Sequence, residues 1–538
     1  MMTAMTQATE DTATLCETFA ATAAAQPAEP ALRSADGAVA WTWRDYADHV
    51  HAAAAGLHGL GVRRGDTVAL WLSNRPEFHV ADAAAMQLGA APFSIYSTFT
   101  VEQAEHVVAD AGSRVLVTEP AYLEHALEVR ERGNTALELV VLVEGSHTNA
   151  LTWDELQAAA PAGFDVATAA AEVSADDLAT LIYTSGTTGA PKGVELTHGN
   201  VVAQCAALGE ALGLVPRQSA ISWLPMAHIA ERLCTHYIPM RLGWTVTCLD
   251  DPRSIGRLLP RVRPQFFFSP PRLWEKLRAA TIAELGDRPD GPTALASLGL
   301  DGVGVALTGA APCPAEVLEF WHGVGLPLCE VYGMSETTGV ATVNPPDAVR
   351  IGTVGRPLPG VEVALSDVGE VLMRGPVVMR GYRNRPDATA MALDAGGWMH
   401  SGDIGVFDDD GYLRIVDRIK ELIISAAGKN MSPANIEATI KSAGSVIGCV
   451  CAIGDARPYN VALLTLDPDV AATVDDPQAE LAAQIDRANA KLARVEQIKR
   501  FTVLPEWLPG GDELTPTMKL KRKPIAAKYA AEIEALYA

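Results

Sequence analysis

Tyr183-Thr-Ser-Gly-Thr-Thr-Gly-Ala-Pro-Lys192-Gly193 is the stretch of this 538-residue sequence that says most about its fold. The apolar run 178–183 predicts a buried strand, which leads directly into a loop of glycine and hydroxyl residues ending in one lysine. Glycines let backbone N–H groups approach an anion, hydroxyls donate hydrogen bonds to it, and the lysine adds positive charge. The stretch predicts a polyphosphate-binding loop, with an ordinary Gly/Ser/Thr surface loop as the alternative.

Three better-known motifs do not fit this chain. A Walker A loop requires Gly-Lys-Ser/Thr, whereas Lys192 follows a proline and precedes a glycine. A Rossmann interpretation of Gly302-Val-Gly304 fails because Leu307 stands where the third glycine should fall. Gly333-Met-Ser-Glu-Thr337 is not a nucleophile elbow, since a threonine replaces the closing glycine. A P-loop NTPase is therefore disfavoured.

Apolar runs of strand length alternate with Ala/Leu-rich helical stretches over the first four hundred residues. Such alternation favours mostly parallel, doubly wound sheets, and its recurrence after residue 245 predicts two α/β lobes. The expected strands are 67–72, 114–117, 139–143, 178–183, 245–249, 265–269 and 304–309, and the expected helices include 78–88 and 101–111.

The pattern changes after about residue 350. Short strands separated by Gly, Pro and Asp, at 355–363, 369–374 and 411–416, predict a small all-β unit. Mixed helix and strand return after 417–420, where we place a domain boundary. We expect a frayed tail at 1–10, an N-terminal domain at 11–417, a hinge at 418–420 and a C-terminal domain at 421–538.

Composition narrows the class of protein. Apolar residues make up 49% of the chain, which is ample for a large buried core. The 42 basic and 65 acidic residues give a net charge of −23, which disfavours binding to nucleic acid. The eight cysteines include no CxxC pair, and neither a secretory signal nor a transmembrane run is recognisable. We expect a cytoplasmic protein with reduced thiols.

Eight further motifs follow the Gly/Thr loop in a fixed order. They are Trp223-Leu-Pro-Met-Ala-His228, Thr308-Gly-Ala-Ala-Pro312, Glu330-Val-Tyr-Gly-Met-Ser-Glu336, Gly369-Glu-Val-Leu-Met-Arg-Gly375 with Gly381-Tyr382, Gly397-Trp-Met-His-Ser-Gly-Asp403, Asp417-Arg-Ile-Lys420, Gly428-Lys-Asn430 and Thr515-Pro-Thr-Met-Lys519.

This series resembles the AMP-forming acyl-CoA synthetase, or adenylating (ANL), superfamily, which includes firefly luciferase and peptide-synthetase adenylation domains. The resemblance spans almost the whole chain. It implies a large N-terminal domain of two doubly wound α/β lobes plus a small distorted β-barrel, followed by a small mobile α+β C-terminal domain. It also implies ATP, Mg²⁺ and coenzyme A as cofactors and cosubstrates.

The resemblance implies a nucleotide site built from most of these motifs. Tyr332 offers a flat face to adenine, Asp403 can accept both ribose hydroxyls, and Arg418 can bond to ribose or phosphate. A single Asp or Arg in a turn is usually an ordinary surface residue, so these two are assigned by their positions in the motifs. The full implied nucleotide set is Thr184, Ser185, Gly186, Thr187, Thr188, Gly189, Lys192, Gly309, Ala310, Ala311, Glu330, Val331, Tyr332, Gly333, Met334, Ser335, Asp403, Arg418 and Lys519.

Four residues are candidates for catalysis. Glu336 lies in a Gly/Ser/Thr turn and is a hard oxygen ligand suited to Mg²⁺, with Thr184 as its metal-binding partner. Lys192 neutralises phosphate charge. His228 matches a family position that closes the acyl pocket, although a single His in an apolar segment is more often structural. Lys519 matches the family lysine that reaches the attacking carboxylate.

The segment around Lys519 departs from the commoner Ser-Gly-Lys pattern, because Thr517 and Met518 precede the lysine. Lys521 is therefore the alternative catalytic lysine. The resemblance further implies a hinge at Lys420, which turns the C-terminal domain between two half-reactions. It places coenzyme A beside the loop Gly428, Lys429 and Asn430.

The substrate is the least determined feature. Phe266-Phe-Phe-Ser-Pro-Pro-Arg-Leu-Trp-Glu-Lys276 resembles a segment of long-chain and very-long-chain fatty acyl-CoA synthetases, although its aromatic residues could simply pack a core. We expect a fatty acid–CoA ligase, with medium-chain or unusual acids left open. The alternatives are an acyl-AMP ligase that loads a carrier protein and a nucleotide- or acyl-binding pseudoenzyme. Peripheral membrane contact and oligomeric state also remain open.

Overall fold

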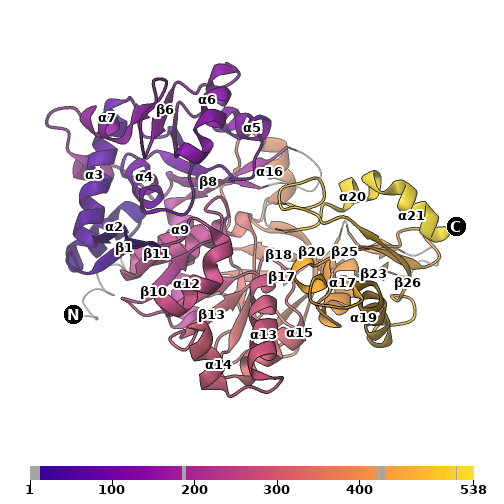
Figure 1. Ribbon diagram of the computed structural model, residues 1–538. Coiled ribbons are helices and arrows are strands. Elements are labelled where there is room, and N and C mark those ends of the chain that lie inside the picture. Colours follow the sequence, from indigo (N-terminus) through magenta and orange to yellow (C-terminus); the bar gives the residue numbers. More distant parts are fainter. Residues whose placement is uncertain (1–11, 185–189, 420, 425–429, 516–517) are drawn as a thin grey trace.

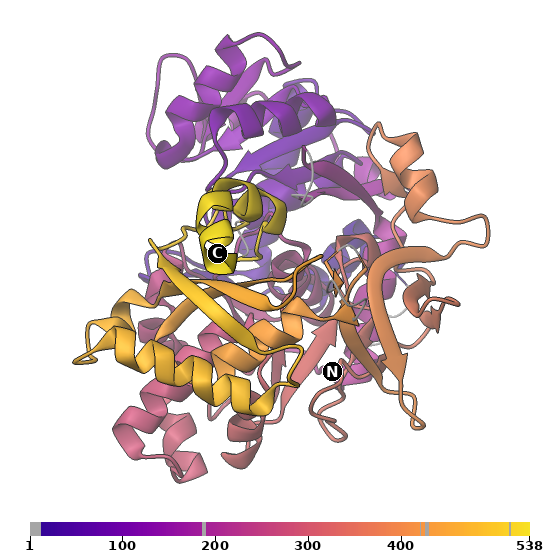
Figure 2. The same ribbon diagram turned by 90° about the vertical axis from the view of Figure 1, so that its right-hand side faces the viewer.

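The computed structural model describes residues 12–184, 190–419, 421–424, 430–515 and 518–538. Figure 1 shows two lobes formed by the first three quarters of the chain and a smaller C-terminal part at one side. Figure 2, turned by 90°, brings that C-terminal part in front of the lobes. No helix in the described residues is long and apolar enough to cross a membrane.

The first lobe is built on an eight-stranded sheet of order β19-β9-β8-β4-β3-β5-β6-β7. The run from β8 to β7 is parallel, and β9 and β19 add antiparallel strands at one edge. The strands are β3 (Thr67–Trp71), β4 (Ala91–Ser94), β5 (Val115–Thr118), β6 (Leu139–Leu142), β7 (Leu151–Thr152), β8 (Leu178–Thr184), β9 (Lys192–Thr197) and β19 (Gly381–Tyr382).

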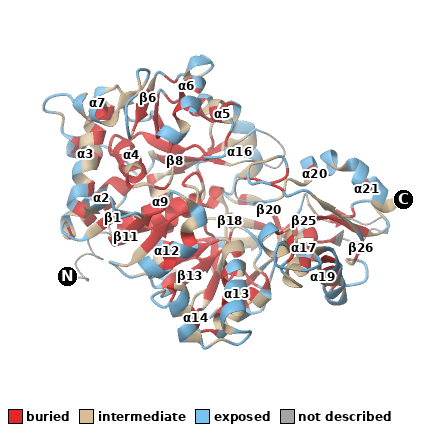
Figure 3. Cartoon of the chain, viewed as in Figure 1, coloured by how far each residue is buried: buried red, intermediate tan, exposed pale blue. Residues whose placement is uncertain are grey.

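Helices cover both faces of this sheet. In β3, Val68 and Leu70 enter the core that packs on one helical layer, while Ala69 and Trp71 enter the core on the opposite face. Both cores are shown in red in Figure 3. A strand buried on both sides requires a continuous apolar run, which is what its sequence shows. One layer contains α2 (Leu15–Ala25), α3 (Trp43–Gly59), α4 (Pro76–Gln87) and α9 (His198–Leu212), and the other α5 (Val101–Ala111) and α6 (Leu123–Glu131).

The second lobe contains a four-stranded sheet, β10-β11-β1-β2, and a five-stranded sheet, β12-β13-β14-β15-β16. In β13, Leu307 packs toward the first lobe, whereas Ala306 joins a separate core with Trp274 and Trp321. The strands are β1 (Pro30–Ser34), β2 (Ala40–Thr42), β10 (Ser219–Ser222), β11 (Thr245–Cys248), β12 (Phe266–Ser269), β13 (Val305–Thr308), β14 (Leu328–Tyr332), β15 (Thr342–Val343) and β16 (Arg356–Pro357); the helices include α12 (Ile255–Val262), α13 (Pro271–Leu285), α14 (Gly291–Leu298) and α15 (Ala315–Gly323).

The predicted all-β unit is present as a half-barrel, an antiparallel sheet of order β17-β18-β20-β21. It packs its buried side against the core shared by the two lobes through Val371, Met373 and Leu413. Its strands are β17 (Glu362–Leu365), β18 (Glu370–Arg374), β20 (Met399–Phe407) and β21 (Leu413–Arg418), with α16 (Pro386–Ala392) between β19 and β20.

The C-terminal part is a separate α+β layer. Its sheet β24-β25-β26 is buried on both faces, with Val450 and Leu464 on one side and Cys451 and Leu463 on the other. Its elements are β22 (Ile423–Ile424), β23 (Asn430–Met431), α17 (Pro433–Ser442), β24 (Ile447–Ile453), β25 (Asn460–Leu466), α18 (Pro468–Ala471), α19 (Pro477–Lys491), β26 (Ile498–Leu504), α20 (Arg522–Lys528) and α21 (Ala530–Tyr537).

Candidate active site

The Gly/Thr loop leaves the first lobe between β8 and β9. These strands are antiparallel, and Thr184 pairs directly with Lys192, so the two ends of the loop lie side by side. His106 on α5 hydrogen-bonds the carbonyl of Pro191 at 3.0 Å and fixes the second end. The predicted phosphate-binding residues Ser185, Gly186, Thr187, Thr188 and Gly189 lie outside the described residues.

Lys192, Tyr382 and Glu336 form one contiguous group at this edge. The short strand β19 pairs with β9 and brings Tyr382 beside the lysine, whose ammonium Nζ lies 4.1 Å from the ring centroid. The Tyr382 hydroxyl donates a 2.7 Å hydrogen bond to Oε1 of Glu336. Burial and the nearby Glu336 raise the pKa of Tyr382, so the hydroxyl remains a donor at neutral pH.

Tyr382 belongs to this group, although the sequence motifs assigned it no role. It stands in the Gly-Tyr motif, but the motif alone gave it no partner. Its strand is two residues long, and the strand with which it pairs is about 190 positions away, so no local pattern could show the contact. The available sequence signal for Tyr382 was the position of its motif, shortly after the expected strand 369–374.

Asp403, on β20 of the half-barrel, lies between two side chains, one from the half-barrel and one from β14. It pairs with Arg418 across β20 and β21, and Arg418 Nε donates to Oδ1 at 3.1 Å. The Tyr332 hydroxyl donates to Oδ2 at 2.7 Å. Burial raises the pKa of Asp403, and Arg418 acts in the opposite direction. The three predicted residues are therefore brought together as one group at the end of β14.

The segments at 309–311 and 330–336 meet backbone against backbone. A Cβ on Gly309 would lie 2.6 Å from Cγ2 and 2.8 Å from the carbonyl of Val331, and one on Gly333 would lie 2.5 Å from the carbonyl of Gly339. Ala310 has a positive φ of 66°, so the chain turns sharply after β13. Only small residues allow this approach. Val331 and Met334 are half-buried against the core, Ser335 is buried, and Ala311 is exposed.

Glu330, in the segment 330–336, is a buried acid without a full set of hydrogen bonds. Its Oε2 atom is buried and has no hydrogen-bond partner among the described residues, and the same is true of Oγ1 of Thr308 on the neighbouring strand. Burial raises the pKa of Glu330 to about 8, so the side chain is largely neutral at pH 7.

His228 lies at the N-terminus of the short helix α10 (Ile229–Arg232). Its Nδ1 accepts a 3.2 Å hydrogen bond from the backbone N–H of Ala230, so Nε2 carries the proton in the neutral ring. Burial, together with the charge of Lys519, lowers the pKa of His228 to about 4. The imidazole is therefore neutral at physiological pH.

Lys519 reaches this group from the C-terminal part. The residue as a whole is exposed, but its ammonium group is surrounded by protein. That burial and the charge of Arg418 lower the pKa of Lys519, while Asp403 and Glu336 favour its charged form. These interactions put the ammonium within electrostatic range of both carboxylates and of His228. Lys521, the alternative, donates to the carbonyl of Gly511 at 2.8 Å.

Arg522 fastens the segment that follows Lys519. Its guanidinium donates two 2.6 Å hydrogen bonds to the two carboxylate oxygens of Glu437 on α17, and its Nε donates to Glu421 at 3.0 Å. A bidentate, mostly buried pair of this kind is rigid. The predicted hinge residue Lys420 and the loop residues Gly428 and Lys429 lie outside the described residues; the backbone of Asn430 pairs with Ile424.

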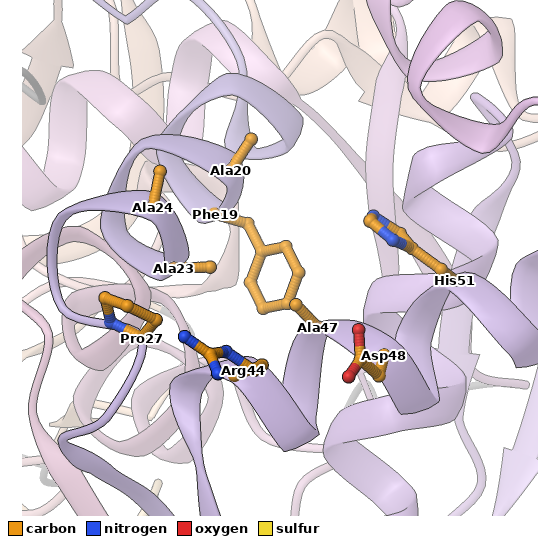
Figure 4. Close-up of a pocket in the computed structure, with 9 residues that line it drawn as sticks. All are labelled: Phe19, Ala20, Ala23, Ala24, Pro27, Arg44, Ala47, Asp48 and His51. Atoms are coloured by element: carbon orange, nitrogen blue, oxygen red, sulfur yellow. The ribbon is translucent and has the colours of Figure 1, made fainter.

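A surface pocket of about 270 Å³ lies elsewhere, between α2 and α3 (Figure 4). It is lined by Phe19, Ala20, Ala23, Ala24, Pro27, Arg44, Ala47, Asp48 and His51. None of the predicted site residues takes part in it. We assign the candidate site by its chemistry, and this pocket lies outside it.

The described residues also limit the kind of metal site. Within them, no three His, Cys, Asp or Glu side chains lie close enough to hold a metal ion. Glu336 has one carboxylate oxygen bonded to Tyr382, and a carboxylate has capacity for a second partner. One protein carboxylate completed by phosphate oxygens and water is the coordination that Mg²⁺ prefers.

Comparison with known proteins identifies the family. The profile of the AMP-binding enzyme family matches residues 19–383, and the profile of the AMP-binding enzyme C-terminal domain matches residues 420–538. The chain belongs to the AMP-binding enzymes. The resemblance drawn from the motifs is thereby confirmed, as is the fold class of two α/β lobes with a half-barrel and a small C-terminal domain.

Relatives of this AMP-binding enzyme cover most of its length. It is 43% identical over 499 residues, 78% of this chain and 87% of the other, to the fadD11 protein of Mycobacterium tuberculosis, named provisionally as a fatty-acid–CoA ligase. It is 34% identical to the long-chain-fatty-acid–CoA ligase FadD15 of Mycobacterium bovis, covering 92% of each chain. The o-succinylbenzoate coenzyme A synthetase of Bacillus subtilis, solved with ATP and a magnesium ion, matches with a TM-score of 0.74 and 26% identity, covering 94% of this chain and 98% of that one.

Proposed function

We propose that this AMP-binding enzyme activates a long-chain fatty acid with ATP, releases pyrophosphate and forms an acyl-adenylate, and then transfers the acyl group to coenzyme A. The observation that carries the proposal is that Lys519 lies within electrostatic range of Glu336 and of the bonded pair Asp403–Arg418, which come from segments far apart in sequence. The similarity to FadD15 over 92% of both chains supports the acid and the acceptor.

The first half-reaction needs positive charge where negative charge accumulates. The acid's carboxylate attacks the α-phosphate, and the α-phosphate–pyrophosphate bond breaks. Lys519 would lie beside the attacking carboxylate and the α-phosphate, and Lys192 beside the departing phosphates. Because both cations are positioned before the reaction, they stabilise the transition state without reorganisation. The engagement of Lys521 with Gly511 supports Lys519 as the acting lysine.

Asp403 and Tyr332 would bind the nucleoside. Asp403 is already oriented by the Tyr332 hydroxyl and Arg418, so its remaining acceptor capacity can serve the ribose hydroxyls. Gly309 and Gly333 let Val331 and Gly339 approach closely, and Glu330 with Val331 would border the base. His228, neutral and half-buried, would close the acyl pocket without placing a charge beside the fatty chain.

Mg²⁺ fits this site, and Glu336 together with Thr184 would hold it. When bound, the ion would neutralise phosphate charge and favour departure of pyrophosphate. The protein orients Glu336 without the ion: Tyr382 hydrogen-bonds its carboxylate, and Met379 donates its backbone N–H to the Glu336 carbonyl at 2.8 Å.

The second half-reaction is thiolate attack on the acyl-adenylate. It does not require Lys519, because the bond to the α-phosphate has already formed. We assign the hinge to Lys420, between domains at 11–417 and 421–538, and the coenzyme A contact to Gly428, Lys429 and Asn430. The start of the C-terminal family match at residue 420 supports this boundary. Peripheral contact with a membrane, as a source of fatty acid, belongs to the same proposal.

The deciding experiment is acid-dependent exchange of pyrophosphate into ATP, followed by AMP release with coenzyme A present, over a series of acids of increasing chain length. We expect both activities to be greatest with long-chain acids. A preference for shorter or unusual acids would revise the substrate, and activity only with a holo-carrier protein would revise the acceptor. Nucleotide binding without exchange would indicate a pseudoenzyme and overturn the proposal.

A further inference from the structure

The segment Pro271-Arg-Leu-Trp-Glu-Lys276 begins α13, and its side chains divide into two groups. Trp274 is fully buried, packs edge-on against Trp321 and donates its indole N–H to the carbonyl of Leu307 at 3.3 Å. Trp274 is therefore a core residue. Arg272, Glu275 and Lys276 instead contact the C-terminal part. The segment therefore has a structural role that does not require contact with the substrate.

Four ion pairs join the second lobe to the C-terminal part here, and we call them the interdomain clasp. Each side carries two basic and two acidic residues, and every one of them faces a residue of opposite charge. The pairs are Arg272 with Asp467, Lys276 with Asp469 at 3.4 Å, Glu275 with Lys441 at 3.8 Å, and Glu316 with Lys491 at 2.9 Å.

Asp467 is the most buried member of the clasp. It is 4% exposed and caps the N-terminus of α18, where its Oδ1 accepts the backbone N–H groups of Asp469 and Val470. That capping role fixes the carboxylate and directs Oδ2 to Arg272. The clasp thus has one buried, oriented contact surrounded by three more exposed ones.

We propose that Arg272, Glu275, Lys276 and Glu316 are positioning residues for Lys519, because their ion pairs hold the C-terminal part in the orientation that delivers this lysine to Asp403. The inference rests on the proposed function. Half-exposed ion pairs are individually weak and are screened by salt, so the clasp can select one orientation and still release it. It therefore favours acyl-adenylate formation over the thioester step.

The sharpest test exchanges the charges of one exposed pair. Glu316→Lys and Lys491→Glu each replace an attraction by a repulsion, and the double variant restores an attraction. We expect each single variant to slow adenylate formation about three- to tenfold in single turnover, and the double variant to recover most of the rate. Thioester formation from supplied acyl-AMP should not slow in any of them.

The matched control is Arg114→Glu, which breaks an exposed 2.6 Å pair with Glu138 inside the first lobe. It should leave both half-reactions unchanged. Wild-type adenylate formation should also fall toward the single-variant rate in 0.5 M NaCl, and the double variant, whose pair is again attractive, should show a similar fall. Small-angle X-ray scattering of the intact chain should show a more extended particle for the single variants than for the wild type.

The outcomes separate the two proposals. Equal slowing of both half-reactions, or no recovery in the double variant, overturns the clasp while leaving the proposed function standing. An unchanged scattering profile in the single variants also overturns it, and this readout needs no activity. Absence of acid-dependent exchange in the wild type refutes the proposed function, whereas scattering still tests whether these pairs hold the orientation.

Discussion

At the scale of single residues, the site depends on side chains that orient other side chains. Tyr382 contributes its ring to Lys192 and its hydroxyl to Glu336, so one residue serves two charged neighbours of opposite sign. Tyr332 orients Asp403 in the same way through its hydroxyl. Removing such a hydroxyl changes the geometry of a charged group without changing the charge.

Tyr382→Phe retains the ring beside Lys192 and deletes only the hydrogen bond to Glu336. Because partners that orient a metal ligand typically contribute about 10–100-fold, we expect pyrophosphate exchange to fall about tenfold and the Mg²⁺ concentration for half-maximal exchange to rise. A magnesium titration measures both. Tyr412→Phe is the control, since that hydroxyl donates to the carbonyl of Ala348. An unchanged magnesium midpoint would contradict the role of Tyr382.

Glu330→Gln tests the buried acid. The pKa of Glu330 is raised from 4.5 to about 8, so the folded chain holds more protons than the unfolded chain between these values. The free energy of unfolding therefore falls, by up to about 1.4 kcal/mol per pH unit, as pH rises through this window. The neutral glutamine removes this loss. Denaturant unfolding at pH 5.5 and 8.5 should show the variant gaining relative stability at the higher pH; parallel behaviour would exclude a buried neutral Glu330.

At the scale of elements, β13 offers a matched pair of glycines at its two ends. Gly309→Ala places a methyl group 2.8 Å from the carbonyl of Val331, so β14 must shift; overpacking of this kind costs about 1–3 kcal/mol. We expect a lower melting temperature and weaker ATP binding by calorimetry. Gly304→Ala meets nothing closer than the Gln265 carbonyl at 3.8 Å. Similar losses in both variants would show that the wall at Gly309 is not special.

Elements with a strong local signal could be predicted from the sequence. The helix expected at 101–111 is α5 (Val101–Ala111), and the apolar run at 139–143 is β6 (Leu139–Leu142). The helix expected at 78–88 begins earlier, at Pro76, because proline suits the first turn of a helix. The two-residue strand β19 could not be predicted, since only its pairing with β9 defines it.

The sequence indicated residues for the candidate site, but it could not indicate the contacts among them. Motif order indicated Asp403 and Arg418, and their direct pairing follows from a hairpin register with an irregularity after Ile404. The orientation of Lys519 depends on contacts between parts of the chain that have no sequence pattern in common. The partners of the charged residues of α13 could not be predicted either, because the sequence of a helix does not show which surface its polar face contacts.

At the scale of the whole molecule, Lys519→Ala separates the two half-reactions. Loss of one positioned cation should slow adenylate formation about 10²–10³-fold. Thioester formation from supplied acyl-AMP should keep most of its rate, because the α-phosphate bond is already formed. Single-turnover assays with labelled ATP and with acyl-AMP measure the two steps; Lys523→Ala, in the same basic run, is the control. Equal loss in both steps would contradict a lysine that acts in only one orientation.

The contacts of Arg522 determine which parts of the chain would move together at the proposed hinge. Glu421 follows residue 420 directly, and Arg522 joins it and Glu437 to the helix that comes after Lys519. Arg522 thus ties the segment that follows Lys519 to Glu421 and to α17. If the proposed hinge at residue 420 turns, the Lys519 segment moves together with Glu421 and Glu437, so the same rotation sets the distance from the Lys519 ammonium to Asp403.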